Sequence, residues 1–273
     1  MRREAFFMAR GGHGQRFALL SEPDFTPCGI VIYVHPFGEE MNKSRHMVTR
    51  AIQGFVDDGW AVLQVDLNGC GDSSGDFSEA SWCDWIDDLS HAVQWCRERF
   101  AVPICLWGLR SGCLLIAEWL TRSGESLPLL FWQPVLNGKQ HLTQFLRLKA
   151  AAEMLTDADS RNVMSEMRKR LDAGEAVEVA GYLLAPAMAS GLSAAILDLP
   201  EGFSATVVVL EVSAAENASV SPACKAAIAR WSSSGTRVSS ELVPGPAFWS
   251  TQYLETVPEL VAASRRSLAE VLQ

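Results

Sequence analysis

The pentapeptide Gly108-Leu109-Arg110-Ser111-Gly112 constrains the fold more than any other part of this chain. It has the spacing of a Gly-x-Ser-x-Gly nucleophile elbow, the tight turn that joins a buried strand to a helix and presents its central side chain at the top of a sheet. Arg110 stands where the nucleophilic serine is expected, and a guanidinium cannot attack a carbonyl carbon. Ser111 follows at the position whose backbone N–H, rather than side chain, normally faces an oxyanion. The sequence therefore predicts the scaffold of an acyl-transfer site without its usual nucleophile.

Short apolar runs alternate with longer segments of helical periodicity along most of the chain. We expect strands at 29–34, 60–65, 104–107, 127–132, 205–212 and 237–243, and helices at 44–58, 81–96, 112–122, 222–231 and 251–272. This order is typical of an α/β fold, a mostly parallel central sheet covered by helices on both faces. The alternation stops at 139–200, which reads as helices. We therefore predict one domain over 1–273, with 139–200 inserted as a helical cap.

Charge and cysteine usage exclude several classes of protein. The net charge is -9, whereas affinity for nucleic acid needs clustered Lys and Arg, so nucleic acid is not an expected partner. The seven cysteines form no C-x-x-C pair, which predicts reduced thiols and neither a metal nor a cofactor. No signal-peptide core follows the amino terminus, and the apolar segment 182–197 is interrupted and too short to span a bilayer. We expect a cytoplasmic protein without a transmembrane segment.

Several longer strings carry a family resemblance. The turn DLNGCGDSSG at 66–75 is similar to the D-x-x-G-x-G-x-S-x-G turn of α/β-hydrolases. The narrower strings are HPFGEEMNKSR at 35–45, WGLR at 107–110, WQPV at 132–135, FLRLK at 145–149 and VPGPAFW at 243–249. Together they resemble the exosortase A system-associated hydrolase 2 family over nearly the whole chain. The resemblance implies an α/β-hydrolase fold and a bacterial protein encoded beside an exosortase and exopolysaccharide system.

The positions of the usual catalytic triad are only partly filled. A Gly-x-x-His string is expected after the final strand, but Gly245-Pro246-Ala247-Phe248 places Phe248 there, and phenylalanine cannot accept a proton. The triad acid should follow the strand at 205–212, where the nearest carboxylate is Glu216. Glu216 is either the catalytic acid or a solvated loop carboxylate. Ser111 is either a nucleophile or a structural serine near the start of a helix.

His35 is the histidine best placed to act as a displaced base, because it ends a strand at the edge where this fold forms its active cleft. The alternative is a structural role. Pro36 follows it and has no N–H, so only Phe37 or Gly38 could donate to an oxyanion from this loop. The catalytic candidates are thus Ser111, His35 and Glu216.

A charged string follows the same strand end. It either lines a pocket or forms a solvated loop in which Asn42 or Ser44 caps the next helix. Arg110 is expected as a partly buried cation that pairs with Glu39, Glu40 or Asp66, or that binds a substrate carboxylate or phosphate. The candidate substrate-binding residues are Arg110, Phe37, Gly38, Glu39, Glu40 and Arg45.

Two function classes remain open. The first is a hydrolase or acyltransferase that acts on an ester, a thioester or an acylated glycan with a non-standard site. The second is a catalytically inactive, hydrolase-fold binding or accessory protein with an anion or glycan pocket around Arg110. Both take a small-molecule or acylated-glycan partner, and a homodimer is one assembly that the sequence leaves open.

Overall fold

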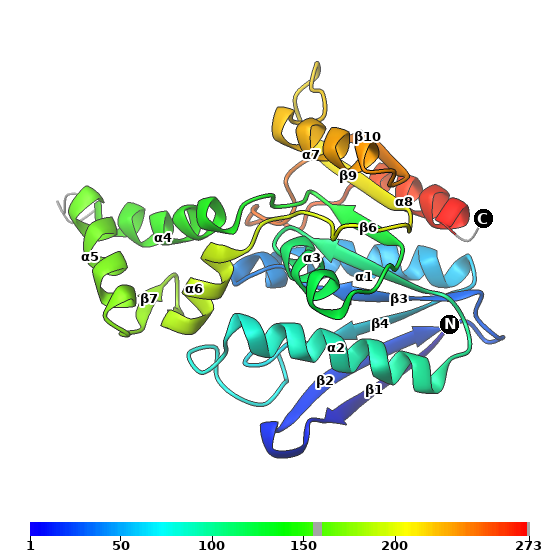
Figure 1. Cartoon of the computed structure of the whole chain (residues 1–273), viewed down its shortest axis with the longest axis horizontal. Helices are drawn as coiled ribbons and strands as arrows, with labels where there is room; N and C mark the ends of the chain where they lie inside the picture. The colour runs from blue at the N-terminus through cyan, green and yellow to red at the C-terminus, as the bar shows by residue number, and fades with distance from the viewer. Residues whose placement is uncertain (155–159, 272–273) are drawn as a thin grey trace.

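The computed structural model describes residues 1–154 and 160–271 and is built around an eight-stranded sheet (Figure 1). The strand order is β1-β2-β4-β3-β5-β6-β9-β10. The strands are β1 Arg2–Ala9, β2 Gln15–Glu22, β3 Gly29–Val34, β4 Trp60–Val65, β5 Ile104–Leu109, β6 Leu129–Trp132, β9 Val207–Ser213 and β10 Val238–Pro244. All neighbouring pairs from β4 to β10 are parallel, so the predicted α/β fold is confirmed.

Helices cover both faces of this sheet. They are α1 Glu39–Asp57, α2 Trp82–Arg99, α3 Gly112–Ser123, α4 Gly138–Met154, α5 Ser160–Asp172, α6 Pro186–Ala194, α7 Pro222–Ser233 and α8 Pro258–Val271. α1 and α8 pack on one face, and α2, α3 and α7 pack on the other (Figure 1). The central strands β3, β5 and β6 are buried along their whole length because both of their faces are covered.

The amino-terminal hairpin of β1 and β2 extends the sheet in antiparallel fashion, and these two strands were not among those predicted from the sequence. Arg16 of β2 is 2% exposed and pairs with Asp88 of α2 at 2.8 Å. Arg10 pairs with the same carboxylate at 3.2 Å, and the backbone N–H of Asn68 donates to it at 2.8 Å. A buried, fully hydrogen-bonded carboxylate therefore joins the hairpin to α2 and to the glycine-rich loop.

Two helices begin at residues other than those predicted. α1 begins at Glu39, with Gly38 as its N-cap at φ 58°, so the expected caps Asn42 and Ser44 are wrong. The two acidic side chains Glu39 and Glu40 then lie in the first turn, where the helix dipole favours them. α8 begins at Pro258 rather than at residue 251, because proline is suited to a first helical turn but not to a helix interior.

The segment between β6 and β9 extends to one side of the sheet (Figure 1). It contains α4, α5 and α6, as the helical pattern predicts, and also a short antiparallel hairpin of β7 Val177–Val179 and β8 Tyr182–Leu184. The turn residues Ala180 and Gly181 both have positive φ, as a type I′ hairpin turn requires. The expectation of helices alone was wrong here, since alanine at the first turn position gives no sequence signal of such a turn.

None of the helices in the described part of the chain combines the length and the hydropathy that a bilayer crossing requires.

Candidate functional site

The turn between β5 and α3 has the backbone geometry of a nucleophile elbow. Arg110 adopts φ 55°, in the left-handed region that is unfavourable for a residue with a side chain. A Cβ on Gly112 would lie 2.3 Å from the carbonyl oxygen of Val34, and one on Gly108 would lie 2.9 Å from the backbone nitrogen of Cys113. The two glycines are therefore required for the close approach of strand and helix, as the pentapeptide predicted.

The Arg110 side chain is held by two partners. Its Nε and Nη2 donate to the Glu40 carboxylate at 3.2 Å, and its guanidinium lies over the Trp249 ring at 5.3 Å from the centroid. Of the three carboxylates expected as partners, Glu40 is the one that pairs. Burial raises the pKa of Glu40, while the positive charge of Arg110 opposes this shift. The elbow thus contains a partly buried ion pair at the position where hydrolases place a hydroxyl.

Ser111 follows Arg110 in the turn, and its side chain is buried. Its Oγ accepts a hydrogen bond from the backbone N–H of Phe37 at 2.8 Å. The Phe37 N–H, one of the two expected oxyanion donors, is therefore already used within the protein. The hydrogen bonds of the described residues join Ser111 to the loop after β3 and not to an imidazole.

His35 is buried, and backbone groups occupy both of its ring nitrogens. Nε2 accepts from the N–H of Leu67 at 3.2 Å, and Nδ1 lies 2.8 Å from the carbonyl oxygen of Pro36. Together these partners require the neutral tautomer that carries its proton on Nδ1, and burial lowers the pKa of His35 accordingly. The Trp85 ring packs edge-on at 5.6 Å. His35 thus has a structural role, because its ring links the loop after β3 to the loop after β4 through hydrogen bonds.

Glu216 lies in the exposed loop between β9 and α7, which projects beyond the end of the sheet (Figure 1). The buried carboxylate of this region is instead Glu211, which accepts from the N–H of Ser221 at 2.6 Å and from its Oγ at 2.8 Å. Glu211 thereby holds the residue that caps α7. Phe248, at the usual histidine position, is buried and packs against the Trp132 and Trp249 rings.

A pocket of about 190 Å³, here called the elbow pocket, adjoins Arg110. It is lined by Phe37, Glu39, Glu40, Lys43, His141, Gln144, Phe145, Leu148, Trp249 and Ser250. It lies between the first turn of α1, one face of α4 and the loop after β10. It includes the two residues that hold the Arg110 guanidinium, so a ligand in it would lie over the elbow.

The structure brings together most of the predicted substrate-binding residues, but not all of them. Phe37, Glu39 and Glu40 line the elbow pocket. Gly38 lies next to its wall, where a Cβ would stand 3.2 Å from the Phe145 ring, so glycine lets α4 approach. Arg45 does not line this pocket: its side chain is 51% exposed and pairs with Asp66 at 3.6 Å.

His141 also lines the elbow pocket and was not among the residues predicted to bind substrate. It is 5% exposed, and neither ring nitrogen has a hydrogen-bond partner among the described residues. Burial, with a smaller effect of the nearby Arg110 charge, lowers its pKa from 6.5 to about 3, so the ring is neutral at pH 7. Its only sequence signal is helical spacing with Gln144, Phe145 and Leu148, which has meaning only once the position of α4 is known.

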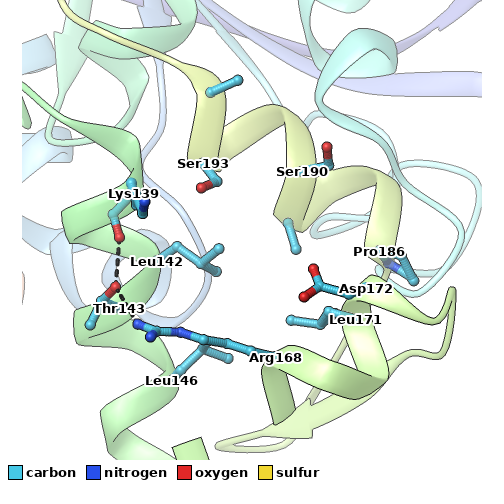
Figure 2. Close-up of a pocket in the computed structure, with 12 residues that line it drawn as sticks. Lys139, Leu142, Thr143, Leu146, Arg168, Leu171, Asp172, Pro186, Ser190 and Ser193 are labelled. Carbon is cyan, nitrogen blue, oxygen red and sulfur yellow. Dashed lines mark hydrogen bonds between the residues drawn. The ribbon is translucent and has the colours of Figure 1, made fainter. Parts of the chain in front are cut away.

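The opposite face of α4 lines a second pocket, of about 620 Å³, between α4, α5 and α6 (Figure 2). Leu142 and Leu146 form part of its apolar surface, and Arg168 of α5 donates to Thr143 at 3.1 Å. α4 is therefore a wall with one face toward the elbow pocket and the other toward a pocket within the 139–200 segment.

The described residues contain no group of three side chains arranged to hold a metal ion. Burial raises the pKa of the Cys70 and Cys113 thiols, so neither is a thiolate at pH 7.

Comparison with known proteins identifies this architecture. The family model Hydrolase_4, described as serine aminopeptidase, S33, matches residues 26–174. The human protein ABHD12B is 31% identical over 80 residues, which are 29% of this chain and 21% of that protein. The chain thus matches about a fifth of the length of this curated relative.

Solved esterase structures are similar over almost the entire chain. Est1E from Butyrivibrio proteoclasticus, with bound ferulic acid, has a TM-score of 0.71 at 17% identity, covering 98% of this chain and 99% of that one. A carboxyl esterase from Bacillus coagulans in complex with glycerol has a TM-score of 0.67 at 13% identity, covering 100% of both chains. At these identities the likeness establishes the fold.

Proposed function

Because the chain belongs to the α/β-hydrolase family described as serine aminopeptidase, S33, we propose that it is a hydrolase-fold protein that binds a small ligand over its elbow without hydrolysing it. One observation carries this proposal. Arg110 occupies the nucleophile position and is held there by Glu40 and Trp249. A cation locked in this way can orient a ligand, but it cannot form an acyl-enzyme.

The surroundings of the elbow support binding rather than turnover. A serine nucleophile needs a base within hydrogen-bonding reach and free donors for the oxyanion. The Ser111 hydroxyl instead accepts from Phe37, and the His35 ring is engaged by two backbone groups. A catalytic role for Ser111, His35 and Glu216 would require these hydrogen bonds to be exchanged.

The ligand we propose is a small organic molecule with acyl or sugar character. The resemblance to the exosortase-associated family favours a component of exopolysaccharide assembly. The ligands of the neighbouring structures, ferulic acid and glycerol, are likewise small organic molecules. Residues 139–200 act as the cap of this pocket within a single domain. In support, the Tyr182 hydroxyl donates to Glu39 at 3.0 Å and so fastens the cap hairpin to α1.

Two assays on the full chain separate binding from catalysis. A fluorophosphonate probe and short-chain nitrophenyl esters should give neither labelling nor turnover, and a panel of acylated and free sugars should raise the melting temperature. Arg110→Ala should abolish that rise. Arg45→Ala is the matched control and should keep it, because Arg45 lies outside the elbow pocket.

Ester turnover that disappears in Ser111→Ala would overturn the binding proposal in favour of a hydrolase or acyltransferase with a relocated site. That outcome is a real alternative, since the solved neighbours include esterases.

A further inference from the structure

The charged side chains of the elbow pocket are already matched by groups of the protein itself. Glu40 pairs with Arg110 at 3.2 Å, and Glu39 accepts from the Tyr182 hydroxyl at 3.0 Å. The Lys43 ammonium donates to the Ser250 carbonyl oxygen at 3.4 Å. Two carboxylates and two cations therefore balance around the pocket. A ligand with a net charge of either sign would upset this balance without gaining an unpaired partner.

His141 is the exception among the buried polar groups of the pocket. It is 5% exposed, and both of its nitrogens lack a partner in the described part of the chain. Buried polar groups without hydrogen bonds are rare in native proteins, because each one costs stability. Packing does not explain the choice of histidine, since its contact with the Phe37 ring at 6.3 Å is one that a phenylalanine could make.

The chemistry of the imidazole indicates which ligand group it can bind. A neutral ring has one N–H donor and one nitrogen acceptor. Burial keeps the ring neutral, and the nearby Arg110 cation adds a smaller effect in the same direction because it would repel a second positive charge. A hydroxyl group is also both a donor and an acceptor, so hydroxyl groups of one ligand can satisfy both sides of the ring. A carboxylate can only accept, and an ammonium can only donate.

The aromatic residues that line the elbow pocket are suited to binding a small ring-shaped ligand. Phe37, Phe145 and Trp249 supply aromatic surfaces, which pack against the apolar faces of a ring while its polar edges reach His141. The volume of about 190 Å³ has room for several water molecules and therefore for a small ligand such as a single sugar ring.

We propose that His141 is the specificity-determining residue of the elbow pocket, and that it selects an uncharged, hydroxyl-bearing ligand of the size of a single sugar ring by donating one hydrogen bond and accepting another. The inference rests on the proposed binding function. It goes further by excluding anions, which Arg110 alone would favour.

Titration calorimetry of the full chain with three matched probes tests the charge preference. Methyl glucoside, glucuronate and glucosamine share one ring and differ in charge. The neutral glycoside should bind about tenfold or more tightly than either charged probe.

Variants of His141 test whether this side chain determines the affinity for the neutral glycoside. His141→Leu should weaken binding of the neutral glycoside about tenfold or more, and His141→Gln should recover part of the loss, because an amide again offers a donor and an acceptor. His91→Leu, a histidine on α2 outside the pocket, is the control and should bind as the parent does. The melting temperature of His141→Leu should stay equal or rise, because the variant removes unpartnered polar atoms from the interior. A purely structural histidine would instead lose stability.

The possible results separate the proposed role of His141 in ligand selection from the proposed binding function of the elbow pocket. Preferential binding of glucuronate, equal affinity in His141→Leu, or no binding by any of the three probes would overturn the selection of an uncharged hydroxyl. The first two results would still leave a ligand pocket at the elbow. Ester turnover lost in Ser111→Ala would overturn the proposed binding function itself.

Discussion

Two arginine–carboxylate pairs in this molecule have the same chemistry and opposite surroundings. Arg16 and Asp88 are both at most 2% exposed, and the Asp88 carboxylate accepts from Arg10, Arg16 and the Asn68 N–H. Arg110 and Glu40 have side chains that are 16% and 21% exposed, and they adjoin a pocket lined by the His141 imidazole, which has no hydrogen-bond partner among the residues that the structure describes. The first pair is buried among protein partners, whereas the second lies beside a pocket that a ligand can enter.

This difference indicates how a structural ion pair can be separated from a functional one. A buried pair is tolerated only when every charge is compensated, and the Asp88 cluster meets that condition. The elbow leaves polar atoms uncompensated at the edge of a cavity, and such atoms are typical of binding sites. Saturation of hydrogen bonds, rather than the presence of a salt bridge, is therefore the informative property.

The largest effect on stability should come from Asp88→Ala. The change leaves Arg16 buried without its partner, and breaking one side of a buried pair costs about 3–5 kcal/mol of unfolding free energy. Urea denaturation measures this loss. Glu40→Ala is the matched comparison and should cost clearly less, because solvent reaches the Arg110 side chain. Equal losses in the two variants would contradict the contrast between the two pairs.

The second largest effect on stability should come from lowering the pH into the mildly acidic range. The pKa of His141 is lowered from 6.5 to about 3 by burial, so the unfolded chain binds a proton that the folded chain does not. Stability is then complete above pH 6.5 and falls as the pH drops toward 3; one such histidine accounts for about 1.4 kcal/mol by about pH 5.5. His35, whose pKa is also lowered by burial, acts in the same direction.

Glu40 acts in the opposite sense: burial raises its pKa, so its contribution to stability declines as the pH rises from its ordinary value of 4.5 to its raised value in the folded protein. Comparison of the parent with His141→Leu isolates the histidine contribution, because Glu40 is present in both. Urea denaturation at about pH 7.5 and about pH 5.5 should show the drop, and His141→Leu should remove about 1.4 kcal/mol of it. An unchanged pH dependence in that variant would mean that His141 is not buried as a neutral ring.

A smaller effect is expected for Ser111→Ala. The variant leaves the buried Phe37 N–H without an acceptor, which costs about 1–2 kcal/mol. Thermal unfolding measures the cost, and binding at the elbow pocket should persist in the variant. Arg45→Ala marks the lower end of the series at less than about 0.5 kcal/mol, since Arg45 is half exposed and its pair with Asp66 is 3.6 Å long. A cost for Ser111→Ala as small as that for Arg45→Ala would contradict the structural hydrogen bond.

Much of the framework could be predicted from local patterns. The central strands are continuous apolar runs, and the glycines around Arg110 have a spacing that few other structures need. The amino-terminal hairpin could not be predicted in this way. β1 is exposed over most of its length and shows no alternation of buried and exposed residues. The hairpin is held in place by the pairing of Arg16 with Asp88, which lies 72 residues further along the chain.

The sequence alone predicted which chemistry is missing. Neither an arginine at the elbow nor a phenylalanine in the Gly-x-x-His string has the reactive group of the usual nucleophile or base, and this holds whatever the packing because reactivity belongs to the residue type. Periodicity determined the α/β class in the same local way.

Only the tertiary structure decided which groups meet. Glu40, rather than Glu39 or Asp66, reaches Arg110 across 70 residues of sequence. His141, rather than His35, lines a pocket with ring nitrogens that have no partner in the described part of the chain. Such pairings depend on where α1 begins and on where α4 lies relative to it. The directions of helices and loops in space set these contacts, and short-range sequence patterns do not encode them.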